Sequence, residues 1–144
     1  MKISEEGKDL IKSFEGCRLN AYKCSAGVPT IGYGNTYYPN GDKVQMSDVI
    51  TLEQAKELFD DLIVRYERIV NSKLKVEVKQ NEFDALVSHT YNTGGSTTLF
   101  KLVNMEANKD KIKDWFLTKY ITANGKVLQG LKNRRLKEWE LYNK

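Results

Sequence analysis

The feature that most constrains this fold is a short amphipathic helix that runs into a glycine-hinged hairpin. Ser4 is a typical N-cap residue, and the apolar residues of one helical face are Ile3, Leu10, Ile11 and Phe14. Gly16 stands where a left-handed C-cap ends many helices. We therefore expect a helix over residues 4–15, with the carboxyl group of Glu15 in its last turn. That position suits a general acid, although many helix-end carboxylates are plain surface residues.

Residues 17–45 are expected to form a small β region. Short strands are expected at residues 22–23, 30–33 and 43–45, with turn signals at residues 25–27 and 39–42. Gly32 and Gly34 flank Tyr33, and glycines there allow the backbone to approach a ligand closely or to bend tightly.

The rest of the chain has helical periodicity. Thr51 and Gln54 form a capping box at the start of a helix that runs to about Asn71 and is long enough to join two lobes. Further helices are expected over residues 80–93, 97–106 and 108–119, and a last helix holds Leu136, Trp139 and Tyr142. Residues 121–130 are expected to form a loop or a hairpin-like turn around Asn124. The pattern predicts a helix-rich α+β protein.

Composition limits the function classes. The 144 residues are 40% hydrophobic, which allows one domain with a real core. Two cysteines and one histidine exclude a standard structural zinc site within one chain. The net charge of +4 suits either simple solubility or attraction to a polyanion, and basic residues cluster at Lys126, Lys132, Arg134, Arg135 and Lys137. No nucleic-acid-binding motif accompanies them, so no nucleic-acid partner is expected. There is no apolar run long enough for a membrane span and no apolar signal-peptide core.

The spacing of Glu15, Cys24 and Thr30 resembles the signature of the phage-type lysozymes, the endolysins of the T4 and P22 kind (glycoside hydrolase family 24). Segments 80–88, 91–94 and 125–135 resemble further motifs of that family in the same order. The resemblance implies one lysozyme-like α+β domain over residues 1–144. It would have a small β-hairpin lobe at about 14–55 and a larger helical lobe at about 72–144, on which the helix of residues 1–15 packs. A long helix would join the lobes, with a cleft between them.

The resemblance also implies an activity. The expected enzyme is an endolysin muramidase that hydrolyses the β-1,4 bond between N-acetylmuramic acid and N-acetylglucosamine, with Glu15 as general acid and water activated near Cys24 and Thr30. Its partner would be the glycan strands of bacterial peptidoglycan, and it would act as a monomer without metal or cofactor. It would be made in the host cytoplasm and reach the wall after release, through a separate pore-forming protein. A lytic transglycosylase and a non-catalytic wall-binding module remain alternatives.

The resemblance further implies a set of substrate-binding residues: Gly34, Thr36, Tyr91, Asn92 and Thr98. The role of Cys24 stays open between a thiolate that stabilises positive charge or activates water, a weakly hydrogen-bonding spacer, and a small buried residue. Cys17 is either a partner for Cys24 in a disulfide that would form only with rearrangement, or a buried apolar residue.

Four other polar residues bear on the expected site. Asn35 stands where the family often has a histidine, which puts any role of that histidine in doubt here. His89 lies inside a helix and is expected to be structural. Arg134 or Arg135 pairs with Glu15, or else both belong to a solvated basic helix face.

Overall fold

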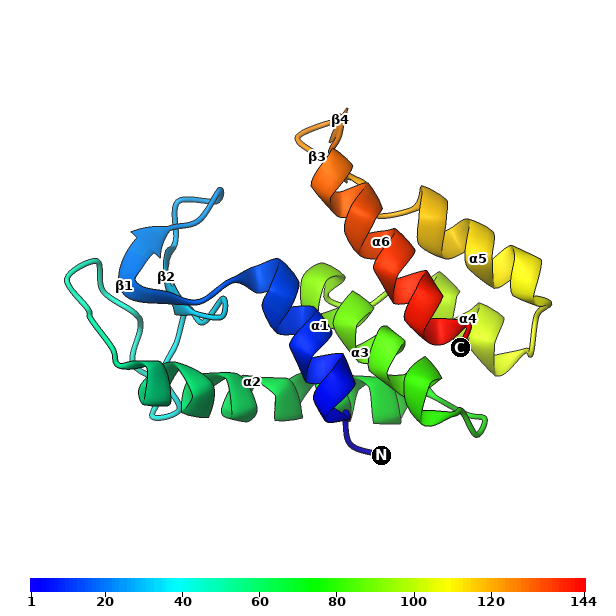
Figure 1. The fold of residues 1–144 in the computed structure, drawn as a ribbon, viewed down its shortest axis with the longest axis horizontal. Helices are drawn as coiled ribbons and strands as arrows, with labels where there is room; N and C mark the ends of the chain where they lie inside the picture. Colours follow the sequence, from blue (N-terminus) through cyan, green and yellow to red (C-terminus); the bar gives the residue numbers. More distant parts are fainter. The chain divides into compact units, whose positions relative to one another are not determined.

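The computed structural model describes residues 1–144 and has the α+β composition that the sequence predicts (Figure 1). The elements in chain order are α1 (Glu5–Glu15), β1 (Arg18–Lys23), β2 (Pro29–Gly32), α2 (Leu52–Lys73), α3 (Gln80–Thr93), α4 (Thr97–Asn104), α5 (Lys109–Thr118), β3 (Thr122–Ala123), β4 (Lys126–Val127) and α6 (Gln129–Tyr142). None of the helices combines the length and apolar character that crossing a membrane requires.

The chain forms two compact units. We call residues 11–65 the hairpin unit, and residues 1–10 together with 66–144 the helical unit. The division falls within α1, after Leu10, and within α2, after Arg65.

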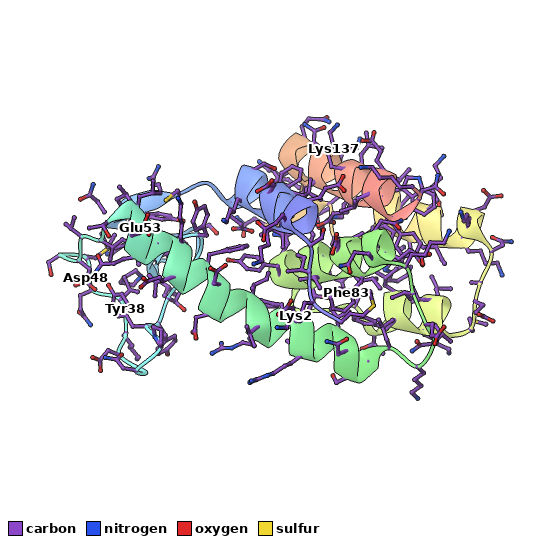
Figure 2. The ribbon with its side chains drawn as sticks, turned by 60° about the horizontal axis from the view of Figure 1, so that its bottom comes forward. Lys2, Tyr38, Asp48, Glu53, Phe83 and Lys137 are labelled. Carbon is purple, nitrogen blue, oxygen red and sulfur yellow. The ribbon has the colours of Figure 1, made fainter.

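The hairpin unit is built on the antiparallel pair β1–β2, in which Tyr22 is opposite Thr30 and Arg18 is opposite Gly32. Its core consists of Ile31, Val44 and Leu58, covered by Ala21, Tyr38 and Ile50. The Tyr38 hydroxyl donates a 2.6 Å hydrogen bond to the carboxylate of Asp48 (Figure 2). Burial and this bond raise the pKa of Tyr38 to about 12, so the phenol stays protonated and holds the loop after β2 in place.

The prediction of a strand at residues 43–45 is wrong. Lys43 forms only an isolated bridge with Tyr37. The reason is a turn just after it, in which Gln45 N–H donates to the Asp48 carboxylate at 2.9 Å and Asp48 N–H donates to the Gln45 carbonyl at 3.0 Å. These local bonds occupy the N–H and the carbonyl of Gln45, which are the backbone groups that a longer strand would use for pairing.

The capping signals in the sequence are confirmed. The Ser4 hydroxyl accepts from the Gly7 N–H at 3.3 Å. At the start of α2, Thr51 N–H donates to the Gln54 side chain at 2.9 Å and Gln54 N–H donates to the Thr51 hydroxyl at 3.1 Å, which is a capping box. α3 ends at Gly94, whose φ of 84° is the left-handed C-cap conformation.

The helical unit packs α3 and α5 against α6, and α4 against α5 (Figure 1). Its core is largely aromatic and aliphatic: Phe83, Leu86, Val87, Leu99, Phe100, Val103, Ile112, Phe116, Trp139 and Tyr142. β3 and β4 form a minimal hairpin around Asn124 and Gly125, with φ of 53° and 76°. Positive φ at both turn residues is what a two-residue hairpin of type I′ requires.

Candidate functional site

The carboxyl group of Glu15 lies at the C-terminal end of α1, in the hairpin unit, and is half-buried. The helix stops there because Gly16 takes a φ of 68°, and its N–H closes the last turn on the Lys12 carbonyl at 3.0 Å. The Lys12 ammonium lies over the rings of Phe59 at 4.8 Å and Tyr33 at 5.5 Å, which fixes that turn against the unit's aromatic core. The helical turn that carries Glu15 is thus packed against the aromatic core of its own unit.

Cys24 and Thr30 are brought together at the turn between β1 and β2. Cys24 N–H donates to the Val28 carbonyl at 3.0 Å, and Gly27 N–H donates back to the Cys24 carbonyl at 2.8 Å. Thr30 follows on β2, only 3% exposed, and its hydroxyl donates to the same Val28 carbonyl at 2.9 Å. The short turn therefore places the thiol and the hydroxyl side by side.

The surroundings of Cys24 lower the pKa of its thiol. Hydrogen bonds from the backbone N–H groups of Val28 and Ala26, and a smaller contribution from the Thr30 hydroxyl, lower the pKa of the thiol below its ordinary value. The hydroxyl has a single proton, which in this structure is directed to the Val28 carbonyl, so only rotation would direct it to the sulfur. Cys24 is partly exposed, so its interpretation as a small buried residue is wrong.

The loop after β2 carries the next expected residues. Gly34 has a φ of 96°, a conformation that side chains rarely adopt, and Thr36 is half-buried. Asn35 is 5% exposed, and its amide donates to the Leu58 carbonyl on α2 at 3.4 Å. At this position the chain therefore uses a buried polar tether between the loop and α2.

The other three expected residues lie in the helical unit. Tyr91, on the last turn of α3, packs its ring against that of Tyr66 with 4.8 Å between centroids. The next residue, Asn92, is exposed, and Thr98 is exposed in the first turn of α4. The candidate residues thus form two sets, one on each unit.

The two neighbouring arginines of α6 are buried, contrary to the expectation of a solvated basic helix face. Arg134 and Arg135 are 4% and 0% exposed, so the prediction that they belong to a solvated face is wrong. Both pair with the buried carboxylate of Glu138, at 3.3 Å and 2.8 Å respectively. The Ser88 hydroxyl on α3 donates to the same carboxylate at 2.6 Å. Ser88 and Glu138 were not predicted from the sequence, although Glu138 follows Arg135 by three residues and Arg134 by four, on the same helical face.

The buried charges of this cluster act on one another. Burial raises the pKa of Glu138, and the two guanidinium groups oppose that rise. Burial also lowers the pKa of Arg135. Such a cluster is costly to break by removing one member.

His89 is buried beside the same cluster, as a structural residue. Its ring contacts those of Phe116 and Tyr120 edge-on, with centroids 5.6 and 5.3 Å away. Burial first, and then the charges of Arg135 and Arg134, lower the pKa of His89 to about 3. The imidazole is therefore neutral in the folded protein at neutral pH.

This shift predicts a pH dependence of stability. Unfolding returns His89 to a pKa of about 6.5, so below that pH the unfolded chain binds one more proton than the folded chain. Stability from this group is complete well above pH 6.5 and falls as the pH drops toward 3. From high pH to pH 5 the free energy of unfolding should fall by about 2 kcal/mol because of this group, measured by urea unfolding at each pH. In His89→Gln this part of the slope should vanish; an unchanged slope would contradict the assignment.

Cys17 and Cys24 are both free thiols. Cys17 is exposed rather than buried, and its side chain contributes, after burial, to raising the pKa of Tyr33. β1 lies between the two cysteines, and an extended strand of six residues is about 20 Å long, whereas a disulfide needs Cα atoms within about 7 Å. A bond between them therefore requires β1 to leave its place beside β2.

The fold, with Glu15 closing α1 and Cys24 and Thr30 on the hairpin that follows, defines the lysozyme-like class of α+β proteins. The family model described as phage lysozyme matches residues 12–138. The chain belongs to the phage lysozyme family.

Known relatives agree with this assignment. The endolysin of Bacillus phage PZA is 41% identical over 99% of this chain, which spans 55% of that relative's length. The endolysin of Acyrthosiphon pisum secondary endosymbiont phage 1 is 37% identical over 99% of this chain and 98% of its own length. Among solved structures, the endolysin from Escherichia coli O157:H7 phage FAHEc1 has a TM-score of 0.87 and 41% identity, covering 99% of this chain and 93% of its own.

Proposed function

We propose that this chain is an endolysin muramidase that hydrolyses the β-1,4 bond between N-acetylmuramic acid and N-acetylglucosamine in bacterial peptidoglycan. The observation that carries the proposal is the hairpin-unit arrangement of the half-buried Glu15 with an acidified Cys24 thiol beside a buried Thr30 hydroxyl. Membership of the phage lysozyme family supports it. The protein acts as a monomer on the glycan strands of the wall and needs no metal or cofactor.

In the proposed reaction Glu15 gives its proton to the glycosidic oxygen as that oxygen leaves the anomeric carbon. A water molecule, oriented by the Thr30 hydroxyl, attacks the same carbon from the other side of the broken bond. The Cys24 thiolate accepts the proton that this water loses, or stabilises the positive charge on the sugar ring. The products are a new reducing end and a free hydroxyl group.

Digestion of purified peptidoglycan tests the proposal. We expect the suspension to clear, with new reducing sugar ends in proportion and fragments heavier by one water in mass spectrometry. Anhydro-sugar ends without new reducing ends would identify a lytic transglycosylase instead. Binding to the wall without new ends would identify a non-catalytic module.

A second prediction concerns Cys24. If the thiolate acts through its charge, Cys24→Asp should keep or raise the rate, while Cys24→Ser should lower it by about 10²-fold, the lower end of general acid–base effects. Thr30→Ala should also lower the rate while costing only about 1 kcal/mol of stability, for its bond to the Val28 carbonyl. The measurements are initial rates of reducing-end formation and urea unfolding.

The matched control for Cys24 is the other thiol of the chain. Cys17→Ser changes an exposed cysteine and should leave the rate unchanged. If Cys24→Ser and Cys24→Ala both keep the parent rate, the residue is a spacer and water is activated by Thr30 without it.

The localisation of the protein is part of the same proposal. The enzyme acts on the cell wall, and it reaches the wall from the host cytoplasm through a separate pore-forming protein. Cells that make this chain should lyse only when such a pore-forming protein is co-expressed, and that result would support the route. Lysis without the pore would contradict it.

A further inference from the structure

Asn92 is an exposed residue held by a buried one. Its side-chain oxygen, Oδ1, accepts a 2.7 Å hydrogen bond from Nη2 of Arg135, whose side chain is 0% exposed. A bond from a charged donor is shorter and stronger than one between neutral groups. The surface end of α3 is thus bonded to a buried group inside the helical unit.

The guanidinium of Arg135 is itself held on its other sides. Its Nε lies 2.8 Å from Oε1 of Glu138, and Nη1 donates to the Tyr120 carbonyl at 3.4 Å. The second oxygen of Glu138 is taken by Ser88 at 2.6 Å and by Arg134 at 3.3 Å. Since Ser88 and Asn92 are one helical turn apart on α3, the cluster runs along one face of that helix to its exposed end.

This contact decides which end of the Asn92 amide faces outward. A guanidinium has only N–H donors, whereas an amide has an oxygen that accepts and an NH₂ group that donates. A flipped amide would direct its own N–H donors at those of Arg135. The oxygen therefore points inward and the NH₂ group is presented at the surface.

We propose that Arg135 is a positioning residue for glycan binding: by holding Oδ1 of Asn92, it presents the Asn92 NH₂ group to an acceptor oxygen of the glycan strand. Sugar hydroxyl and N-acetyl carbonyl oxygens have that chemistry. The inference rests on the proposed function, because it assigns a recognition contact to the same substrate. It extends that function to a residue that does not touch the substrate.

Steady-state kinetics on soluble peptidoglycan fragments test the proposal. Asn92→Asp keeps a partner for Arg135 but presents no donor, so KM should rise about 3- to 10-fold, the value of one neutral hydrogen bond, with kcat unchanged. Arg135→Lys keeps a positive charge beside Glu138, but one ammonium cannot both pair with Glu138 and donate to Asn92 as the planar guanidinium does, so KM should rise similarly. The double variant Arg135→Lys/Asn92→Ala should be no worse than Asn92→Ala alone.

Several results would overturn the proposal. One is an Asn92→Asp variant that keeps the parent KM, because a purely structural role of residue 92 would need only its contact with Arg135. Another is a double variant whose KM effect is the product of the two single effects. Lys137→Gln, an exposed change on the same helix (Figure 2), is the control and should leave KM unchanged.

An NMR measurement separates this proposal from the proposed function. The Asn92 side-chain NH₂ signals of the parent should be shifted from their random-coil positions, and in Arg135→Lys they should move toward them. Signals that stay in place would overturn the positioning role whatever the activity. Should Arg135→Lys fail to fold by circular dichroism, the Asn92→Asp kinetics decide. If the parent forms no new reducing ends, the proposed function fails, while the NMR result still reports on the orientation of the amide.

Discussion

Glu15→Gln is expected to lower the rate of peptidoglycan hydrolysis by about 10²–10⁴-fold while the protein stays folded. The amide keeps the size and hydrogen-bonding reach of the carboxyl group, but it cannot deliver a proton to the leaving oxygen. Glu15 is half-buried at the end of α1, outside the apolar core, so the change should cost little stability. The measurements are initial rates of reducing-end formation and the melting temperature.

Glu53→Gln is the matched control for this prediction. Glu53 is an exposed carboxylate of the hairpin unit, in the first turn of α2 (Figure 2). It should keep the parent rate. A folded Glu15→Gln protein that clears the wall at the parent rate would rule out Glu15 as the general acid.

The largest effect on stability is expected for Glu138→Gln, with a loss of about 3–5 kcal/mol in the free energy of unfolding. Glu138 is 0% exposed and is the anion for two buried guanidinium groups. An amide in its place removes the negative charge that faces both guanidinium groups in the interior of the helical unit. Urea unfolding followed by tryptophan fluorescence measures the loss, because Trp139 is buried one residue further along α6.

Glu140→Gln is the control on the same helix. Glu140 is paired with Lys137 at 3.4 Å, but both side chains are more than half exposed, and water screens such a pair. This change should cost less than about 1 kcal/mol. Equal losses in the two variants would show that the buried cluster stabilises no more than a surface pair.

The sequence predicts the elements of this fold well because its signals are local. The capping box at Thr51, the left-handed glycines at 16 and 94 and the Asn124–Gly125 turn each act within a few residues. The expected helices therefore agree with the observed ones to within a few residues. The prediction of a strand at residues 43–45 was wrong because the Asp48 carboxylate accepts from the Gln45 N–H, which competes with strand pairing there.

The candidate site was harder to predict because its environment depends on contacts between distant segments. The spacing of Glu15, Cys24 and Thr30 is visible in the sequence, but the acidification of the thiol depends on where the N–H groups of the turn point. The basic run at Lys132–Arg135 looks solvated in the sequence. Only the packing of α6 on α3 shows that both arginines are interior and that Arg134 contacts Ser88.

The cluster of Ser88, Arg134, Arg135 and Glu138 also restricts how such a chain can change over generations. A single apolar substitution at one of these positions takes at least one partner from the polar groups that stay buried, which is destabilising on its own. A set of apolar residues of similar volume can replace a buried ion pair without that loss, but only when the whole set is exchanged together. We therefore expect these four positions to be exchanged together with less loss of stability than one at a time, which unfolding measurements on single and combined variants would check.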